Sequence, residues 1–380
     1  MSTCCFNRGS CRAKNEVISL FANADVIVNG KRPWDPQVHD DRFYARLLAD
    51  GTLGFGESYT EGWWDCEALD ELCFRVLRAR LSERVGFNKH VLIATVTSIC
   101  LNLQNKRGAR LVGKTHYDLG NDFFEAMLDP AMQYSCAYFL KSSGLSDAQK
   151  AKMDLICRKL GLKPGMRLLD IGCGWGGLAR YAAQYHGCEV VGITISSQQQ
   201  QYAQKWCQGL PIEIRLQDYR DISEKFDRAV SVGMMEHVGH KNYRCYLDAV
   251  NRCLHENGLF LCHTICSNRS SMSPNPWLTR YIFPNSMLPS VSQITKAAEG
   301  LFVLEDAHNF GSSYDQTLLA WEGNFRKSWA RFQGSYGERF YRMWRYYLLS
   351  CAGAFRARHV QLLQFVFSKH GVVGGYASIR

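Results

Sequence analysis

The stretch Arg167-Leu-Leu-Asp-Ile-Gly-Cys-Gly-Trp-Gly-Gly-Leu-Ala-Arg180 decides the fold that this sequence predicts. A short apolar run leads into a cluster of glycines, and a helix-like pattern follows. The succession is typical of a strand, a tight turn and a helix, which open a doubly wound, Rossmann-like α/β sheet. Glycines let the backbone turn sharply near a ligand, and the next helix N-terminus offers free N–H groups. We therefore expect a nucleotide-like cofactor at this turn, with contacts from Asp170, Gly172, Gly174 and Gly176.

The identity of the cofactor depends on where acidic residues stand. The glycines also fit the G-x-G-x-x-G dinucleotide pattern, which requires an acid at the end of the second strand, about 20 residues on. The second strand, 189–193, ends instead in Thr194-Ile-Ser-Ser-Gln-Gln199, without an acid. Asp170 precedes the glycines, and Gln217-Asp218 closes a third strand at 213–216. This placement favours S-adenosylmethionine over a nicotinamide cofactor, and an ordinary tight turn stays the alternative.

The alternation of strands and helices continues after this opening. Runs at 226–232 and 258–265 read as a fourth and a fifth strand, 302–308 resumes the sheet, and 359–367 is expected as the final strand. Helices are expected at 147–160 and 243–253. Ligands bind at the carboxyl ends of strands in an open α/β sheet, so topology places Glu236 and His237, which follow the fourth strand, over the cofactor. The fifth strand carries His263 to the same edge.

At 380 residues the chain is long for one domain, which predicts a large domain with a smaller one. Residues 1–15 are expected as a frayed tail, 16–101 as a small α-rich N-terminal domain that associates with lipid or the membrane, 102–112 as a linker and 113–380 as the catalytic domain. The small domain is expected to contain a short strand and turn at 25–30, helices at 41–49 and 69–81, and a packed turn at 51–64. Prolines within 267–300 indicate an insertion that caps the site.

The net charge of +10 indicates a polyanionic partner, either a membrane surface or nucleic acid. Zinc-finger spacing, RNP-like aromatic motifs and helix-turn-helix patterns are lacking, which disfavours nucleic acid. Basic residues alternate with aromatic ones between 326 and 358. Such a pattern suits anionic lipid headgroups, although a helix with packed aromatics and solvated arginines would look the same.

The sixteen cysteines are scattered and form no C-x-x-C pair, so they are interpreted as reduced thiols, and no metal site is assigned. The N-terminus lacks the apolar region of a signal peptide, and the longest apolar-rich run, 91–103, is too short to span a bilayer. We therefore expect a soluble, cytoplasmic protein that associates peripherally with the inner face of the membrane.

Seven motifs in one order carry a resemblance to a known family. From about residue 17 onward, the chain resembles the bacterial cyclopropane-fatty-acyl-phospholipid synthases. The motifs are His116-Tyr-Asp-Leu-Gly-Asn-Asp122, Met132-Gln-Tyr-Ser-Cys-Ala-Tyr138, Leu169-Asp-Ile-Gly-Cys-Gly-Trp-Gly-Gly177, Glu236-His-Val-Gly239, Leu261-Cys-His-Thr-Ile265, Tyr281-Ile-Phe-Pro-Asn285 and Cys351-Ala-Gly-Ala-Phe-Arg-Ala-Arg358.

The resemblance implies a reaction and its site. S-adenosylmethionine would donate a methylene group to a cis double bond of a phospholipid acyl chain, and a bound bicarbonate ion would act as general base. Homodimerisation is a further expectation. The implied cofactor contacts beyond the glycine turn are Tyr134, Ser135, Thr194, Gln199, Gln217 and Asp218. The implied bicarbonate cradle is Cys136, Glu236, His263 and Tyr314.

The chemistry explains these residue types. An alkene that attacks a sulfonium methyl group becomes a carbocation, so water must be excluded and ring faces stabilise the charge. Cys351, the family's traditional active-site cysteine, is interpreted as lining the site, because no step requires a covalent intermediate. Candidate aromatic contacts to the cation are Tyr134, Tyr138, Trp175, Phe283 and Tyr314.

Three other functions remain open at this point. Related enzymes add a methyl branch to acyl chains, and the loss of the cradle would favour them. A lipid-binding protein without turnover would be indicated by degenerate glycines or by a missing Glu236 or His263. A nucleic-acid methyltransferase would need an Asn-Pro-Pro-Tyr-like motif after the fourth strand. Gly233-Met-Met-Glu-His-Val stands there instead.

Overall fold

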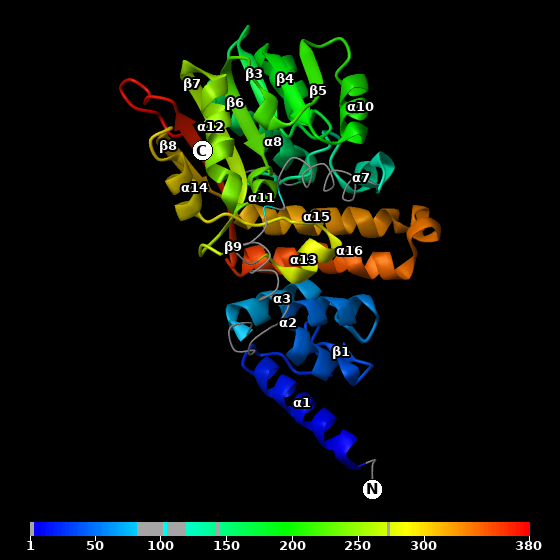
Figure 1. The fold of residues 1–380 in the computed structure, drawn as a ribbon. Helices are drawn as coiled ribbons and strands as arrows, with labels where there is room; N and C mark the ends of the chain where they lie inside the picture. Colours follow the sequence, from blue (N-terminus) through cyan, green and yellow to red (C-terminus); the bar gives the residue numbers. More distant parts are fainter. Residues whose placement is uncertain (1–3, 82–101, 103, 105–118, 141–143, 272–273) are drawn as a thin grey trace. The chain divides into compact units, whose positions relative to one another are not determined.

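The structure is a computed structural model that describes residues 4–81, 102, 104, 119–140, 144–271 and 274–380 (Figure 1). The chain divides into two compact units. The N-terminal unit comprises Met1–Cys100, Ser273–Pro284 and Leu318–His359. The C-terminal unit comprises Leu101–Met272, Asn285–Thr317 and Val360–Arg380. None of the helices in the described ranges has both the length and the apolar character needed to cross a membrane.

The C-terminal unit is built on a seven-stranded sheet in the order β5-β4-β3-β6-β7-β9-β8. Neighbouring strands from β5 to β7 pair in parallel, and β9 pairs antiparallel with both β7 and β8. The predicted doubly wound sheet is therefore confirmed. The strands are β3 (Arg167–Ile171), β4 (Glu189–Thr194), β5 (Ile212–Leu216), β6 (Phe226–Val232), β7 (Leu254–Ser267), β8 (Val303–Asn309) and β9 (Val360–Ser368).

Side chains that alternate along the strands pack into two different cores. Leu168 packs with α8 (Leu145–Lys159) and α9 (Gly177–His186) on one face of the sheet. Leu169 and Ile171 pack with α12 (Tyr243–Cys253) and α14 (Val291–Ala298) on the other face. Because successive strand residues point to opposite faces, Asp170 lies on the α8 side.

The described residues of the N-terminal unit form mainly helices, together with the two-residue strands β1 (Gln37–Val38) and β2 (Trp64–Asp65). Its helices α3 (Leu69–Arg78) and α16 (Gln333–Arg356) pack closely, because a Cβ at Gly353 would lie 2.5 Å from Asp70 O. The described part of this unit also contains the helices α1 (Cys4–Ala22), α2 (Arg42–Thr60), α13 (Pro276–Tyr281) and the later part of α15 (Ser312–Ser328).

Three predictions for the first 64 residues are wrong. Residues 4–15 of the expected frayed tail belong to the helix α1. Residues 25–30 contain turns but no strand, so only the turn expected there is confirmed. The helix predicted at 41–49 continues as α2 through the expected packed turn, because Gly51 adopts φ 54° and kinks the helix without ending it. Phe55 stacks on Trp64, with 4.5 Å between the ring centroids, and this contact helps to bury the part of α2 that follows Gly51.

The division into units also corrects the expected catalytic domain of 113–380. Residues 318–359 belong to the N-terminal unit, because α16 covers the apolar face that α2 and α3 expose. The expected capping insertion at 267–300 is split between the two units. Its helix α13 belongs to the N-terminal unit, and α14 helps to cover the sheet. The expected linker at 102–112 lies outside the described residues apart from Asn102 and Gln104.

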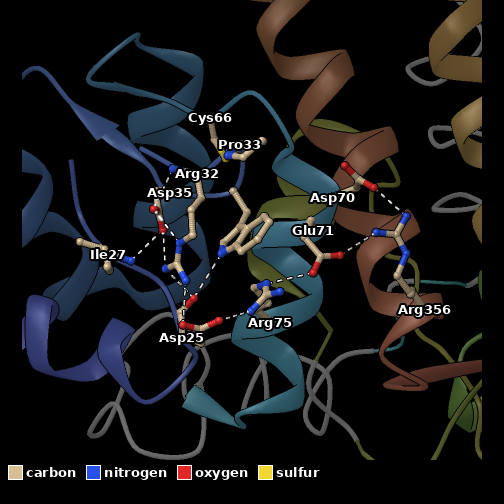
Figure 2. Close-up of polar contacts among 11 residues, drawn as sticks. Asp25, Ile27, Arg32, Pro33, Asp35, Cys66, Asp70, Glu71, Arg75 and Arg356 are labelled. Atoms are coloured by element: carbon tan, nitrogen blue, oxygen red, sulfur yellow. Dashed lines mark hydrogen bonds and ion pairs between the residues drawn. The ribbon is translucent and has the colours of Figure 1, made fainter. Parts of the chain in front are cut away.

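A network of charged side chains connects distant parts of the N-terminal unit (Figure 2). Arg32 donates to Asp35 at 2.9 Å and to Asp25 at 2.8 Å. Arg75 connects Asp25, at 2.6 Å, to Glu71, at 2.9 Å. On α16, Arg356 donates to Glu71 at 3.2 Å and to Asp70 at 2.6 Å. We call this set the Arg32 network.

Candidate active site

The glycine turn after β3 has the backbone that its sequence predicts. Gly172, Gly174 and Gly176 have φ values of 81°, 56° and 86°, a region in which a Cβ is strained. The N–H groups of Gly172 and Cys173 donate to Ile193 O at 2.9 and 3.0 Å, which ties the turn to β4. The α9 helix starts directly after this turn, so its free N–H groups lie at the carboxyl end of the sheet.

Asp170 is buried at the end of β3, with 2 % of its surface exposed. Burial raises its pKa to about 7, although the charge of Lys152 acts in the opposite direction. Its Oδ2 atom is buried and has no hydrogen-bond partner among the described residues. A buried carboxylate oxygen without a partner is costly, so it indicates a place where a ligand supplies the missing donor.

Gly177, the first residue of α9, allows the loop that carries the predicted cofactor residues Tyr134 and Ser135 to lie next to this turn. A Cβ at Gly177 would clash with Ala131 O and Gln133 Nε2. The loop before Tyr134 therefore rests directly on the first residue of α9. Phe124, from α7 (Asn121–Met127), contacts both Tyr134 and Trp175, at 5.3 and 4.9 Å between ring centroids.

Helix α8 holds the loop that carries Ser135, a role that sequence reasoning missed. Gln149 Nε2 donates to Ser135 O at 2.8 Å, and Lys152 Nζ donates to Ser135 Oγ at 2.9 Å. The signal was present in the sequence: buried α8 positions Ala148, Lys152, Leu155 and Lys159 fall at helical spacing. Lysines at two of these four buried positions indicate buried polar contacts.

The other predicted cofactor residues lie at the ends of β4 and β5. Thr194 Oγ1 donates to Gln199 Oε1 at 3.0 Å. The N–H of Gln217 donates to Thr194 O at 3.0 Å, which holds the two strand ends together. The carboxylate of Asp218 is engaged by Arg220, at 2.8 Å from Nη1, and it also accepts the N–H of Arg220. Direct contact of these side chains with a cofactor stays a prediction.

Glu236 follows β6 on α11 (Met235–Val238) and is tied to the end of β7. Its Oε1 atom accepts the N–H of Ile265 at 2.7 Å. Its Oε2 atom is buried, with no partner in the described part of the chain. Burial raises the pKa of Glu236 to about 7, against the opposing effect of the Ile265 N–H. The carboxyl group can therefore take up and release a proton near neutral pH.

His263 lies on β7, opposite Val232 of β6 and Gln364 of β9. Burial lowers its pKa well below the ordinary value, so the ring is neutral. Gln364 Nε2 lies 3.3 Å from Nδ1. When this amide donates to Nδ1, the ring proton sits on Nε2, a buried atom with no partner among the residues described. His263 then presents an N–H donor.

Cys136 and Tyr314 are connected through the start of α15. The N–H of Ala137 donates to Thr317 Oγ1 at 3.1 Å, one turn beyond Tyr314. The ring of Phe310 contacts Tyr138 at 5.1 Å and His263 at 5.7 Å. The structure therefore places the loop of Cys136, the start of α15 and His263 in one neighbourhood, next to the strand end that holds Glu236.

Cys351 differs from the other four residues predicted as catalytic. It lies on α16 in the N-terminal unit, whereas the other four belong to the C-terminal unit. Burial raises the pKa of its thiol to about 12, so the thiol is protonated at neutral pH. Phe283, an expected aromatic contact, also belongs to the N-terminal unit, where its ring meets Tyr347 at 5.6 Å.

The sheet order and the glycine turn are those of the Rossmann-like fold that S-adenosylmethionine-dependent methyltransferases share. The structure of coclaurine N-methyltransferase bound to SAH has the same fold, with a TM-score of 0.70 at 20% identity over 83% of this chain and 98% of that chain.

Closer similarity identifies the family. Residues 104–365 match the family model of mycolic acid cyclopropane synthetase. Cyclopropane-fatty-acyl-phospholipid synthase of Escherichia coli K12 is 51% identical over 97% of this chain and 96% of its own. Mycolic acid cyclopropane synthase CmaA1, solved with SAH and CTAB, has a TM-score of 0.64 at 32% identity, covering 68% of this chain and 98% of its own. The chain belongs to this family of cyclopropane synthases, and the resemblance seen in its motifs is confirmed.

Proposed function

We propose that this protein transfers a methylene group from S-adenosylmethionine to the cis double bond of an unsaturated phospholipid acyl chain and forms a cyclopropane ring. The observation that carries the proposal is the 51% identity with the Escherichia coli synthase across 97% of the chain. The unpartnered Glu236 and His263 atoms at the carboxyl end of the sheet support it, because they offer an acid–base pair to a ligand.

The residues around the glycine turn fit the cofactor. When bound, S-adenosylmethionine supplies an electrophilic methyl group. The α9 N-terminus and the Ser135 loop hold polar groups of the cofactor, and Asp170 offers an acceptor where donors are expected. The aromatic side chains of Tyr134, Trp175 and Tyr138 exclude water from the reacting alkene. A ring face stabilises the developing cation by about 0.5–2 kcal/mol.

Loss of a proton from the new methyl group closes the ring, and bicarbonate, when bound, would supply the general base. Glu236 would hold the hydroxyl group of the ion by accepting its hydrogen bond, which keeps the Glu236 carboxylate away from the cation. His263 Nε2–H and the Tyr314 hydroxyl would donate to the other oxygens, and Cys136 would line the cradle. Neutral donors of this kind suit a buried anion beside a glutamate, because its charge would otherwise be uncompensated.

We also propose that the protein works in the cytoplasm, as a homodimer bound peripherally to the membrane that holds its substrate. Support for membrane binding comes from the end of the α15–α16 hairpin. Trp329, on η3 (Trp329–Arg331), contacts Tyr341 at 5.0 Å, so its aromatic residues form a packed group. Exposed basic residues surround this group, which suits anionic headgroups. They are Arg326, Lys327, Arg331 and Arg339.

Mass spectrometry of lipids tests the reaction. The purified protein is incubated with S-adenosylmethionine, bicarbonate and vesicles of cis-unsaturated phospholipid, and a parallel reaction is kept free of carbon dioxide. We expect a gain of one CH₂ with loss of the double bond, and slower turnover without bicarbonate. A branched or still unsaturated product would instead indicate methyl branching. Cofactor binding without any mass change would indicate a lipid-binding protein.

Vesicle sedimentation tests membrane binding. Replacement of Arg326, Lys327 and Arg331 by Gln should weaken binding to anionic vesicles, by about 1 kcal/mol per charge near the surface. Replacement of exposed Arg12, Lys31 and Arg78 by Gln removes the same charge elsewhere and serves as the control. Equal binding by both triple variants would contradict a role for the hairpin. Sedimentation equilibrium without vesicles tests the dimer, and a monomer across micromolar concentrations would refute it.

A further inference from the structure

We propose that Lys152 is a positioning residue that fixes the Ser135 hydroxyl as a hydrogen-bond donor, so that this loop selects the carboxylate of the methyl donor. The inference rests on the proposed function, because it concerns the same cofactor site. It assigns a role to a buried lysine that none of the family motifs contains.

The geometry around Lys152 leaves little freedom. Its side chain has no exposed surface, and its Nζ atom donates to Gln133 Oε1 and, at 2.9 Å, to Ser135 Oγ. Gln133 is itself fixed, because its Nε2 donates to Ala131 O at 3.1 Å. One turn earlier on α8, Gln149 holds the carbonyl of Ser135 at 2.8 Å. Both the backbone and the side chain of Ser135 are therefore held from α8.

The direction of these hydrogen bonds carries the argument. An ammonium group only donates, and a serine hydroxyl has a single proton. Because Lys152 donates to Ser135 Oγ, the hydroxyl proton must be directed to another acceptor. Lys152 occupies one of the two lone pairs of this oxygen, and its positive charge disfavours the ammonium group of an amino acid at the other. Ser135 is thus set to donate to a carboxylate, and a bond to an anion is stronger than one to a neutral group.

Charge supports the same assignment. The described residues place no carboxylate within ion-pair distance of Lys152 Nζ, whose two oxygen partners are both neutral. The ionisable groups that act on it at longer range are Asp129, Cys136, Asp170 and His263. Burial lowers the pKa of Lys152 to about 8, and the acids oppose this shift. An anion at Ser135 would add negative charge, so it should raise this pKa and cause proton uptake.

Lys159 provides a matched control on the same helix. It is also buried, with 1 % of its surface exposed, and burial lowers its pKa to about 8. Its ammonium group, however, forms an ion pair with Asp306 at 3.1 Å, and Asp306 also binds Arg380 at 2.7 Å. Lys159 thus has the charge compensation that Lys152 lacks. The variant Lys159→Met should affect folding without affecting recognition of a carboxylate.

Titration calorimetry with S-adenosylhomocysteine and its decarboxylated analogue tests the proposal without turnover. The wild-type protein should bind S-adenosylhomocysteine at least about tenfold more tightly than the analogue. Lys152→Met and Ser135→Ala should each remove most of this preference, and the double variant should lose little more, because the two residues act as a unit. Lys159→Met should keep the preference. Retention of the preference in Lys152→Met, or additive losses, would overturn the proposal.

Proton uptake gives an independent result. At pH 8, in buffers of different ionisation enthalpy, binding of S-adenosylhomocysteine to the wild-type protein should take up a fraction of a proton. This fraction should fall for the decarboxylated analogue and vanish in Lys152→Met. If Lys152→Met does not fold, the wild-type measurement alone decides, because equal uptake with both ligands would refute the proposal. If the lipid assay shows no product but proton uptake on binding of S-adenosylhomocysteine is observed, the result would contradict only the proposed reaction.

Discussion

Two groups of buried charged side chains, the Arg32 network of the N-terminal unit and the candidate active site of the C-terminal unit, differ in how their charges are compensated. In the Arg32 network of the N-terminal unit, Asp35 accepts hydrogen bonds from Ile27 N at 2.9 Å, from Arg32 N at 3.1 Å and from the Arg32 side chain. In the C-terminal unit, Asp170 Oδ2, Glu236 Oε2 and His263 Nε2 have no partner within the described ranges. Compensated charge is typical of a structural role, and uncompensated charge is typical of a binding site.

The pKa values follow the same division. Burial would raise the pKa of Asp35, but hydrogen bonds from Arg32 and two backbone N–H groups hold it below its ordinary value. For Glu236 and Asp170, burial prevails and raises each pKa to about 7. A lowered pKa therefore marks a buried carboxylate that stabilises the fold, and a raised pKa marks one that is available to bind a ligand.

The largest effect is expected at Glu236. Glu236→Gln keeps an oxygen for the Ile265 N–H but removes the proton acceptor, so turnover should fall by about 10²–10⁴-fold. Lipid mass spectrometry measures the rate, and calorimetry with S-adenosylhomocysteine provides the control for an intact cofactor site. Activity within threefold of wild type would remove Glu236 from the proposed chemistry.

Replacing Asp35 should have the reverse outcome. Asp35→Asn breaks the charged hydrogen bonds with Arg32, which should lower the free energy of unfolding by about 2 kcal/mol near neutral pH. Because the pKa of Asp35 is lowered in the folded state, its contribution is present above the ordinary aspartate pKa and is lost as the pH falls through the lowered value. Urea unfolding at several pH values measures both.

Turnover by Asp35→Asn at a temperature where the variant is folded should match that of the wild type. A loss of rate there comparable to that of Glu236→Gln would show that the Arg32 network is not purely structural.

A smaller effect concerns the pH dependence of stability at Glu236. Its folded-state pKa of about 7 lies above that of the unfolded chain, so stability is fully present at low pH and is lost as the pH rises through 7. Glu236→Gln removes this loss. The variant should therefore unfold at higher urea concentration than the wild type at pH 8 and at a similar concentration at pH 5, and identical midpoints at pH 8 would contradict the assigned burial of the charge.

The smallest effect is expected at Cys351. Burial keeps its thiol protonated, with a pKa of about 12, so it is a poor nucleophile. Cys351→Ser should leave turnover within about threefold of wild type, and the cost should appear in stability as that of a hydroxyl in an apolar site, about 1–3 kcal/mol. A loss of 10²-fold in a folded variant would restore a chemical role for this residue.

Local patterns in the sequence predict the individual strands and helices of the sheet well. They do not predict the order in which the last strands pair. The bounds of β6 and α12 agree with expectation, because period-2 and period-3.6 patterns are decided locally. The insertion of β9 between β7 and β8 was not predicted, since antiparallel pairing over that distance leaves no local signal. The continuation of α2 beyond Gly51 was missed because tertiary packing outweighed a helix-breaking residue.

The candidate site was predicted to a similar degree. Motifs identified residues that lie at strand ends, such as Glu236 and His263. They did not identify Gln149, Lys152 or Gln364, which hold other residues in place and stand outside every motif. Such supporting residues are defined by three-dimensional contacts, and only the lysine in the buried stripe of α8 gave a hint.

The composition of the N-terminal unit from three separate stretches has a consequence for synthesis of the chain. Its helix α3 meets α16 only after about 280 further residues have left the ribosome, and Arg356 is the partner of Asp70 and Glu71. The first unit to be translated is thus among the last to be completed. Until α16 emerges, the apolar face of α3 is uncovered, and this nascent intermediate is the state in which we expect the chain to depend most on chaperones.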